Sequence, residues 1–140
     1  MDSQELLVEI QSWKGTRWIH GQCLKGVGTD CVRFVCAIGK FAGWVAPDYK
    51  VPVYDIDWAL HNKVSMLENE IQKFAVQVQQ PYQIGDIFLF VYGQCTSHAG
   101  IYIGNNEMVH SYRGQGVIQS ELRHYQKHFH SAWRPFGVKA

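Results

Sequence analysis

The spacing of apolar residues changes once along this chain, near Pro81, and this change constrains the fold more than any other feature. Before Pro81, apolar residues recur at three- and four-residue steps, as they do on one face of a helix. After Pro81, short segments rich in β-branched and aromatic residues alternate with glycine and asparagine turns. Helices followed by an antiparallel meander predict an α+β domain.

The helix predicted from residue 30 is apolar enough to be buried and to form the spine of the domain. We therefore expect the N-terminal helices to pack on a five- or six-stranded antiparallel sheet. The predicted helices are 3–13, 30–43 and 60–75, and the predicted strands are 86–92, 98–103, 107–112, 117–119 and 131–136.

Length and charge narrow the class of protein. With 140 residues, the chain is expected to form one domain over residues 1–140. Its 13 basic and 12 acidic residues nearly balance, which argues against nucleic acid as a partner. No apolar run is long enough to span a membrane, and the acidic N-terminus differs from a secretory signal. We expect synthesis in the cytoplasm without a signal peptide, so action outside the cell would require lysis, a particle or a secretion machine.

The candidate nucleophile is Cys31. A glycine loop ending in Thr29 and Asp30 leads directly into the predicted helix, so the cysteine lies in the first turn. Free backbone N–H groups and the positive end of the helix dipole favour a thiolate at that position. The competing interpretation is a small, buried and unreactive side chain, which is common for free cysteine.

Two histidines are expected on one face of the sheet. If the hairpin loop after Ile103 has three residues, Ile103 pairs with Glu107. Gly100 then pairs with His110, and His98 points to the same side as His110. A register shifted by one residue would separate the two imidazoles.

A cysteine at a helix N-terminus with two histidines nearby is the arrangement that thiol catalysis requires. We assign Cys31 as nucleophile, His98 as base and then acid, and His110 as the residue that orients His98. The N–H of Cys31, with a donor from the loop of residues 18–22, would stabilise the oxyanion. The alternative is a zinc site, but the short spacings of zinc ligands are missing, and we expect no metal or other cofactor. That site would use Cys31, Cys36, His98 and His110.

Three residues near the nucleophile are candidates for substrate binding. Trp18 either lines the cleft or covers the core. Arg33 interrupts the apolar face of its helix, so it is either ion-paired or in contact with an anionic group of the substrate. His20 lies close to Cys31 in the chain.

Five segments of the sequence resemble the NlpC-type papain-like cysteine peptidases of bacterial cell walls. They occur in the order of that family and cover nearly the whole chain. The resemblance is closest to the branch carried by phages and gene-transfer-like particles. The segments are Gly15-Thr16-Arg17-Trp18-Ile19-His20, Lys25-Gly26-Val27-Gly28-Thr29-Asp30-Cys31, Ile84-Gly85-Asp86-Ile87-Phe88-Leu89-Phe90, Ser97-His98-Ala99-Gly100-Ile101-Tyr102-Ile103-Gly104 and Met108-Val109-His110-Ser111-Tyr112.

The resemblance implies a papain-like α+β fold and hydrolysis of an amide in the peptidoglycan stem peptide. In this family the bond typically runs from the side-chain carboxyl of D-glutamate to a diamino acid such as diaminopimelate. The family's cysteine and two histidines correspond to Cys31, His98 and His110, which agrees with the triad above. The resemblance also implies that Asp30 could meet a free substrate amine, and that proteins of a phage tail or phage-like particle are partners.

The chain departs from the family pattern on both sides of the nucleophile. Many members read Asp-Cys-Ser-Gly-Leu, where this chain has Val32, Arg33 and Phe34, and Trp18 replaces a common tyrosine. These changes leave two other functions open. One is a non-catalytic phage assembly or interaction module on the same fold, and the other is a thiol acyltransferase or amidase that acts on another substrate.

Overall fold

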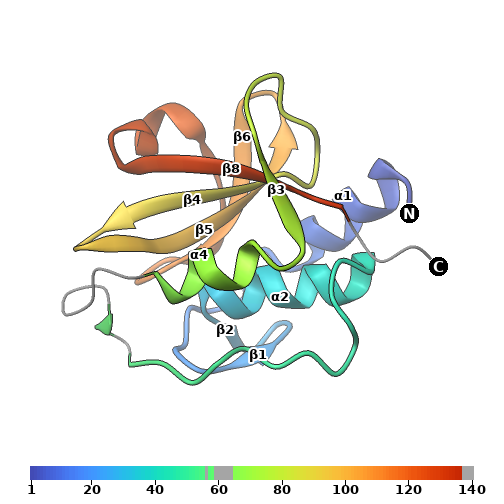
Figure 1. The fold of residues 1–140 in the computed structure, drawn as a ribbon. Coiled ribbons are helices and arrows are strands. Elements are labelled where there is room, and N and C mark those ends of the chain that lie inside the picture. The colour runs from blue at the N-terminus through green and yellow to red at the C-terminus, as the bar shows by residue number, and fades with distance from the viewer. Residues whose placement is uncertain (56, 59–64, 137–140) are drawn as a thin grey trace.

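The computed structural model describes residues 1–55, 57–58 and 65–136. Within them, three helices lie on one side of a six-stranded antiparallel sheet, as Figure 1 shows, which confirms the α+β prediction. None of the helices in these ranges is long and apolar enough to cross a membrane. The helices are α1 (Ser3–Ser12), α2 (Cys31–Ala42) and α4 (Met66–Ile71).

The sheet has the strand order β3-β8-β4-β5-β6-β7, so the last strand of the chain lies between two earlier ones. A short hairpin of β1 and β2 precedes α2, and a 3-10 helix, η1 (Leu122–His128), which the sequence did not predict, joins β7 to β8. The strands are β1 (Cys23–Leu24), β2 (Gly28–Thr29), β3 (Ala75–Val78), β4 (Ile87–Tyr92), β5 (Cys95–Gly104), β6 (Glu107–Tyr112), β7 (Gly116–Glu121) and β8 (Phe129–Pro135).

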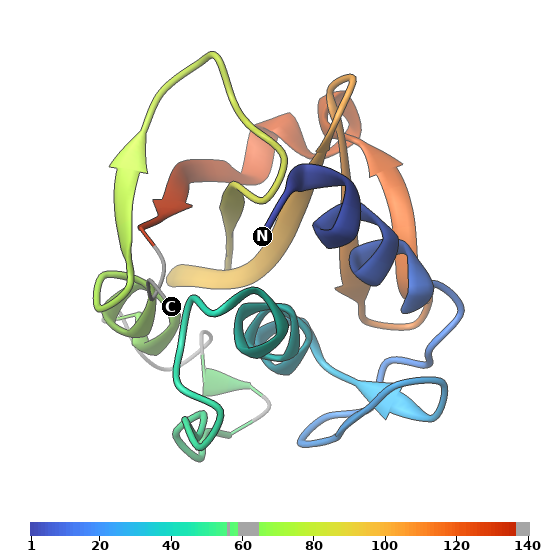
Figure 2. The ribbon, with the colours of Figure 1, turned by 90° about the vertical axis from the view of Figure 1, so that its right-hand side faces the viewer.

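Helix α2 is the spine of the fold, as predicted. Asp30 caps its N-terminus, and Gly43 ends it in the left-handed conformation with φ of 79°. Phe34 and Ile38 are fully buried, and the helix packs against β5 and β6. Figure 2 shows α2 nearly end-on, with the sheet, α1 and the β1–β2 hairpin around it.

The third predicted helix is wrong at its C-terminal end. Residues 59–64 lie outside the described part of the chain, and α4 ends at Ile71. Ala75 belongs to β3, which pairs antiparallel with β8. The helical spacing of Phe74 and Ala75 was a coincidence, because backbone pairing with β8 outweighs a weak local preference for helix.

The hairpin between β5 and β6 has a two-residue turn instead of the predicted three-residue loop. Asn105 and Asn106 both have positive φ, and Gly104 pairs with Glu107. The ladder shifts between Tyr102 and Gly104, and this bulge absorbs one residue. Beyond the bulge, the pairs have the predicted register, so the two candidate histidines share a face.

Candidate active site

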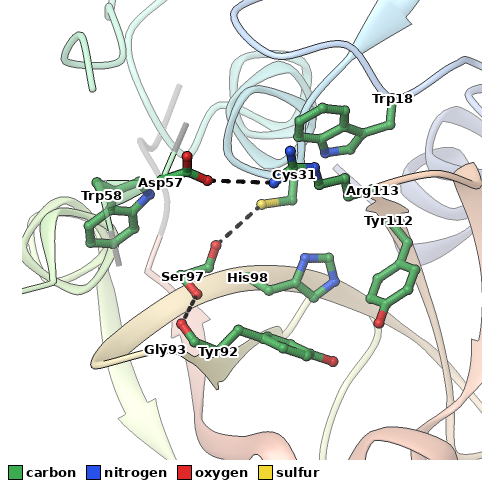
Figure 3. Close-up of a pocket in the computed structure, with 10 residues that line it drawn as sticks. All are labelled: Trp18, Cys31, Asp57, Trp58, Tyr92, Gly93, Ser97, His98, Tyr112 and Arg113. Carbon is green, nitrogen blue, oxygen red and sulfur yellow. Dashed lines mark hydrogen bonds and ion pairs between the residues drawn. The ribbon is translucent and has the colours of Figure 1, made fainter. Parts of the chain in front are cut away.

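Cys31 is the first residue of α2 and lies in the wall of a pocket. Its side chain is 8% exposed, and Sγ donates a hydrogen bond to the carbonyl of Ser97 at 3.7 Å. Figure 3 shows the sulfur directed toward Ser97, with the His98 ring beside it in the same pocket. The loop and cap before α2 therefore bring the predicted nucleophile next to Ser97 and His98 of β5.

The electrostatics of the Cys31 thiol differ from the prediction. Burial, and then the neighbouring Asp30 carboxylate, raise the pKa of the Cys31 thiol to about 12. Backbone hydrogen bonds from Ala99, Val32 and Cys31 lower this pKa, but they do not overcome the burial. The resting residue is therefore a neutral thiol, because burial destabilises a thiolate more than the N-terminus of the helix stabilises it.

His98 and His110 are in direct contact. His98 Nε2 lies 2.7 Å from His110 Nδ1, and His110 is fully buried. Since Nε2 of His98 is engaged, its Nδ1 is the ring nitrogen available to exchange a proton with a thiol. The arrangement is the one that the sheet register predicted.

Both imidazoles are neutral at pH 7. Burial, and then the adjacent His110, hold the pKa of His98 well below its usual value. Burial lowers the pKa of His110 to about 4. A neutral thiol beside a neutral imidazole can react only if the proton moves during the attack on a substrate.

The pocket around Cys31 has a volume of about 400 Å³, and four of its ten described lining residues are tryptophan or tyrosine. Among the described lining residues, Arg113 and Asp57 carry the charges, and their side chains are 3.8 Å apart. The Arg113 guanidinium lies over the Trp18 ring at 5.4 Å, and Figure 3 shows it reaching across the pocket from the end of β6. The lining residues are Trp18, Cys31, Asp57, Trp58, Tyr92, Gly93, Ser97, His98, Tyr112 and Arg113.

Trp18 is the one of the four predicted substrate-binding residues that lines this pocket. Asp30 is 1% exposed, and its carboxylate accepts hydrogen bonds from the backbone N–H groups of Gly21 and Arg33 and from the Arg33 guanidinium at 2.8 Å. His20 Nδ1 lies 3.8 Å from the same carboxylate. Asp30, Arg33 and His20 therefore form a polar cluster beside the pocket, in which the charge of Arg33 is already paired.

Ser120 was not among the residues predicted from the sequence, and its hydroxyl lies 2.9 Å from His110 Nε2. Ser120 pairs with Met108 in the β6–β7 ladder, so it shares a face with His110. Strand alternation could have found it, if the pairing of β7 had been extended beyond residue 119. Arg113 and Asp57 had no comparable signal, because only the tertiary structure brings their segments together.

In the described part of the chain, no group of three or more histidine, cysteine, aspartate or glutamate side chains could hold a metal ion. The rival zinc ligands Cys31, Cys36, His98 and His110 thus do not form a site.

Known proteins were compared with this chain by sequence and by fold. The profile of the NlpC/P60 family matches residues 12–134. The chain is 28% identical over 132 residues to "Murein DD-endopeptidase MepS/Murein LD-carboxypeptidase" of Escherichia coli strain K12. This match covers 92% of the chain and 61% of the relative, so the chain spans about three fifths of that protein.

Solved structures share the fold. An NlpC/P60 family protein from Bacillus cereus ATCC 10987 has a TM-score of 0.69 at 23% identity, over 99% of this chain and 41% of that chain. The NlpC/p60 domain of the peptidoglycan hydrolase SagA has a TM-score of 0.62 at 15% identity, over 94% and 97% of the two chains. The predicted papain-like α+β fold is therefore confirmed.

Proposed function

Because this chain belongs to the NlpC/P60 family of cell-wall peptidases, we propose that it hydrolyses an amide bond in the stem peptide of peptidoglycan. Cys31 is the nucleophile, His98 is the base and then the acid, and His110 orients His98. The observation that carries this proposal is the shared pocket of Cys31 and His98, together with the 2.7 Å contact from His98 to His110. The bond from D-glutamate to the diamino acid is the expected site of cleavage.

The reaction follows from the resting protonation states. As a substrate carbonyl approaches Sγ, the thiol proton moves to His98 Nδ1, and the C–S bond forms. The N–H of Cys31 at the start of α2 stabilises the oxyanion. His98 then donates the proton to the amine, the C–N bond breaks, and the acyl group remains on Cys31 as a thioester. In the second half of the reaction, His98 takes a proton from water, the water oxygen attacks the thioester, and the acid is released as Cys31 regains its proton.

Arg113 supports an acidic peptide as the substrate. It is the cation among the described pocket residues, and its side chain is 64% exposed. The Arg113 guanidinium stacks on the Trp18 indole and lies 3.8 Å from the Asp57 carboxylate. Because both partners of this ion pair are exposed, it is weak, and a substrate carboxylate can take the place of Asp57. Stem peptides carry free carboxylates beside the bond in question. Arg33 is a weaker candidate, because the buried Asp30 carboxylate holds its guanidinium at 2.8 Å.

The test is cleavage of three purified peptidoglycan fragments, followed by mass spectrometry. One carries the D-glutamyl-diamino acid link, one a D,D cross-link and one an L,D terminal bond, since the E. coli relative is named for the last two activities. We expect wild type and Cys36→Ser to release the diamino acid from the first fragment, and Cys31→Ala to release none. Cys36 lies on the same helix, so it is a matched control.

Other outcomes separate the alternatives. Cleavage of the second or third fragment alone would reassign the bond. No cleavage of any fragment, with no acyl adduct on Cys31, would contradict the proposal and favour the non-catalytic module. Transfer of the acyl group to an added amine in place of water would favour the acyltransferase.

Delivery by a phage tail or phage-like particle stays a proposal that rests on the sequence resemblance. Detection of the chain in purified particles by antibody would support it. Activity in a producing cell that makes no particles would contradict it.

A further inference from the structure

Ser120 and Tyr125 extend the contact of the two histidines. His110 Nδ1 faces His98 Nε2 at 2.7 Å, and His110 Nε2 faces Ser120 Oγ at 2.9 Å. Ser120 Oγ in turn lies 3.5 Å from the hydroxyl of Tyr125, in η1. The Tyr125 ring packs edge-on against His110, with the centroids 5.0 Å apart. Each nitrogen of the fully buried His110 therefore has one partner.

We propose that Ser120, supported by Tyr125, is a positioning residue that holds the proton of His110 on Nε2. The inference rests on the proposed function, and it concerns the state in which His98 has taken the thiol proton. The His98 imidazolium then carries a proton on both nitrogens, so its Nε2 must donate to His110. His110 Nδ1 must accept, and a neutral imidazole with a bare Nδ1 carries its proton on Nε2.

That proton needs an acceptor, because His110 has no access to water. Ser120 Oγ is the group within hydrogen-bond distance of Nε2. A buried N–H without an acceptor destabilises the state that carries it, and this effect grows when the imidazole is polarised by a neighbouring charge. The Ser120 hydroxyl therefore stabilises the charged intermediate state more than the neutral resting state, which affects kcat in preference to KM.

The sharpest test compares Ser120→Thr with Ser120→Val. The two side chains have the same shape, both suit a strand, and only threonine keeps the hydroxyl. We expect kcat of Ser120→Val to be about tenfold lower than kcat of Ser120→Thr, with KM values within about twofold of one another. Tyr125→Phe keeps the ring contact, and since its hydrogen bond is long we expect kcat to fall by about threefold or less.

A spectroscopic readout separates positioning from simple packing. Nitrogen-15 NMR of the His110 ring should place the proton on Nε2 in wild type and in Ser120→Thr. In Ser120→Val the proton should shift toward Nδ1. Ser131→Ala is the control, because it removes a buried hydroxyl on β8 and should leave both the His110 tautomer and kcat unchanged.

Equal kcat values for the threonine and valine variants would overturn the inference, and so would an unchanged His110 tautomer in Ser120→Val. The NMR measurement needs no substrate. If wild type cleaves none of the fragments, the proposed function fails, while the tautomer result still decides whether Ser120 holds the His110 proton.

Discussion

Asp30 shows how one residue can serve the fold and restrict the chemistry. It caps α2, accepts a hydrogen bond from the Gly21 N–H and pairs with Arg33, and it precedes the proposed nucleophile, Cys31. Its negative charge also raises the pKa of the Cys31 thiol. The family resemblance implies that this acid meets a substrate amine. In this chain, the Arg33 guanidinium already pairs with the Asp30 carboxylate, as a substrate ammonium group would.

Removal of the Arg33 charge tests this pairing. Arg33→Met leaves the Asp30 carboxylate, 2% exposed, without its guanidinium partner. We expect the free energy of unfolding in urea to fall by about 3 kcal/mol. Asp30→Asn in the same chain should recover part of the loss. A loss below about 0.5 kcal/mol, with a raised KM, would instead indicate that Arg33 serves the substrate.

Arg113 allows a prediction about specificity. Arg113→Gln should raise KM about tenfold for stem peptides with a free carboxylate on the diamino acid. KM for the same peptides with that carboxylate amidated should change little. Steady-state kinetics on the matched pair of peptides measures both values. Arg123→Gln, an exposed arginine of η1, is the control, and equal KM changes for the two peptides would contradict the assignment.

At the scale of elements, the segment that carries Trp18 is held against β7. Gly15 N–H donates to the carbonyl of Val117, and Val117 N–H donates to the carbonyl of Thr16 at 2.8 Å. This close approach requires glycine at residue 116, where a Cβ would lie 2.5 Å from the Thr16 oxygen. The start of β7 therefore determines the position of the segment that carries Trp18 in the pocket wall.

Two glycines of the β6–β7 turn separate backbone strain from crowding. Gly114 and Gly116 both have positive φ, of 87° and 81°, but a Cβ on Gly114 would meet nothing within 4 Å. Gly114→Ala should cost about 1 kcal/mol of unfolding free energy, from the left-handed conformation alone. Gly116→Ala should cost at least about 2 kcal/mol more, with a lower kcat/KM as Trp18 shifts. Urea unfolding measures the loss of unfolding free energy in both variants. Similar losses would show that β7 can move away from Thr16 without a large loss of stability.

For the whole molecule, the buried histidines make stability depend on pH. His110 has a pKa of about 4 in the folded protein, against about 6.5 in an unfolded chain. Below pH 6.5 the unfolded state therefore binds the proton first, and this favours unfolding. The contribution is complete above pH 6.5 and is lost as the pH falls toward 4.

We therefore expect His110 to contribute roughly 3 kcal/mol of the loss in stability between pH 7 and pH 4. Urea unfolding at pH 7, 5.5 and 4 measures the change, and His110→Gln should make the dependence of stability on pH shallower. His124→Gln removes an exposed histidine and should leave the slope nearly unchanged. The same slope in His110→Gln as in wild type would contradict the role of His110.

Features that depend on local chemistry could be predicted from the amino-acid sequence alone. Caps and helical spacing predicted α2 to within a residue or two, and strand alternation put His98 and His110 on one face even though the turn was one residue shorter than expected. Residue type, spacing and register were enough to predict that Cys31, His98 and His110 lie together, and their catalytic roles stay a proposal. The end of α4 was mistaken for more helix, because the partner of β3 is the last strand of the chain.

Features that depend on burial and on distant partners are visible only in the folded chain. The charge state of Cys31 follows from how much of the thiol the folded chain removes from water, which no local pattern reveals. The pairing of Asp57 with Arg113 and the contact of Ser120 with His110 join separate elements. Burial and long-range contacts are properties of the packed chain, so the sequence predicted which groups meet in the pocket, and the fold set their protonation and their neighbours.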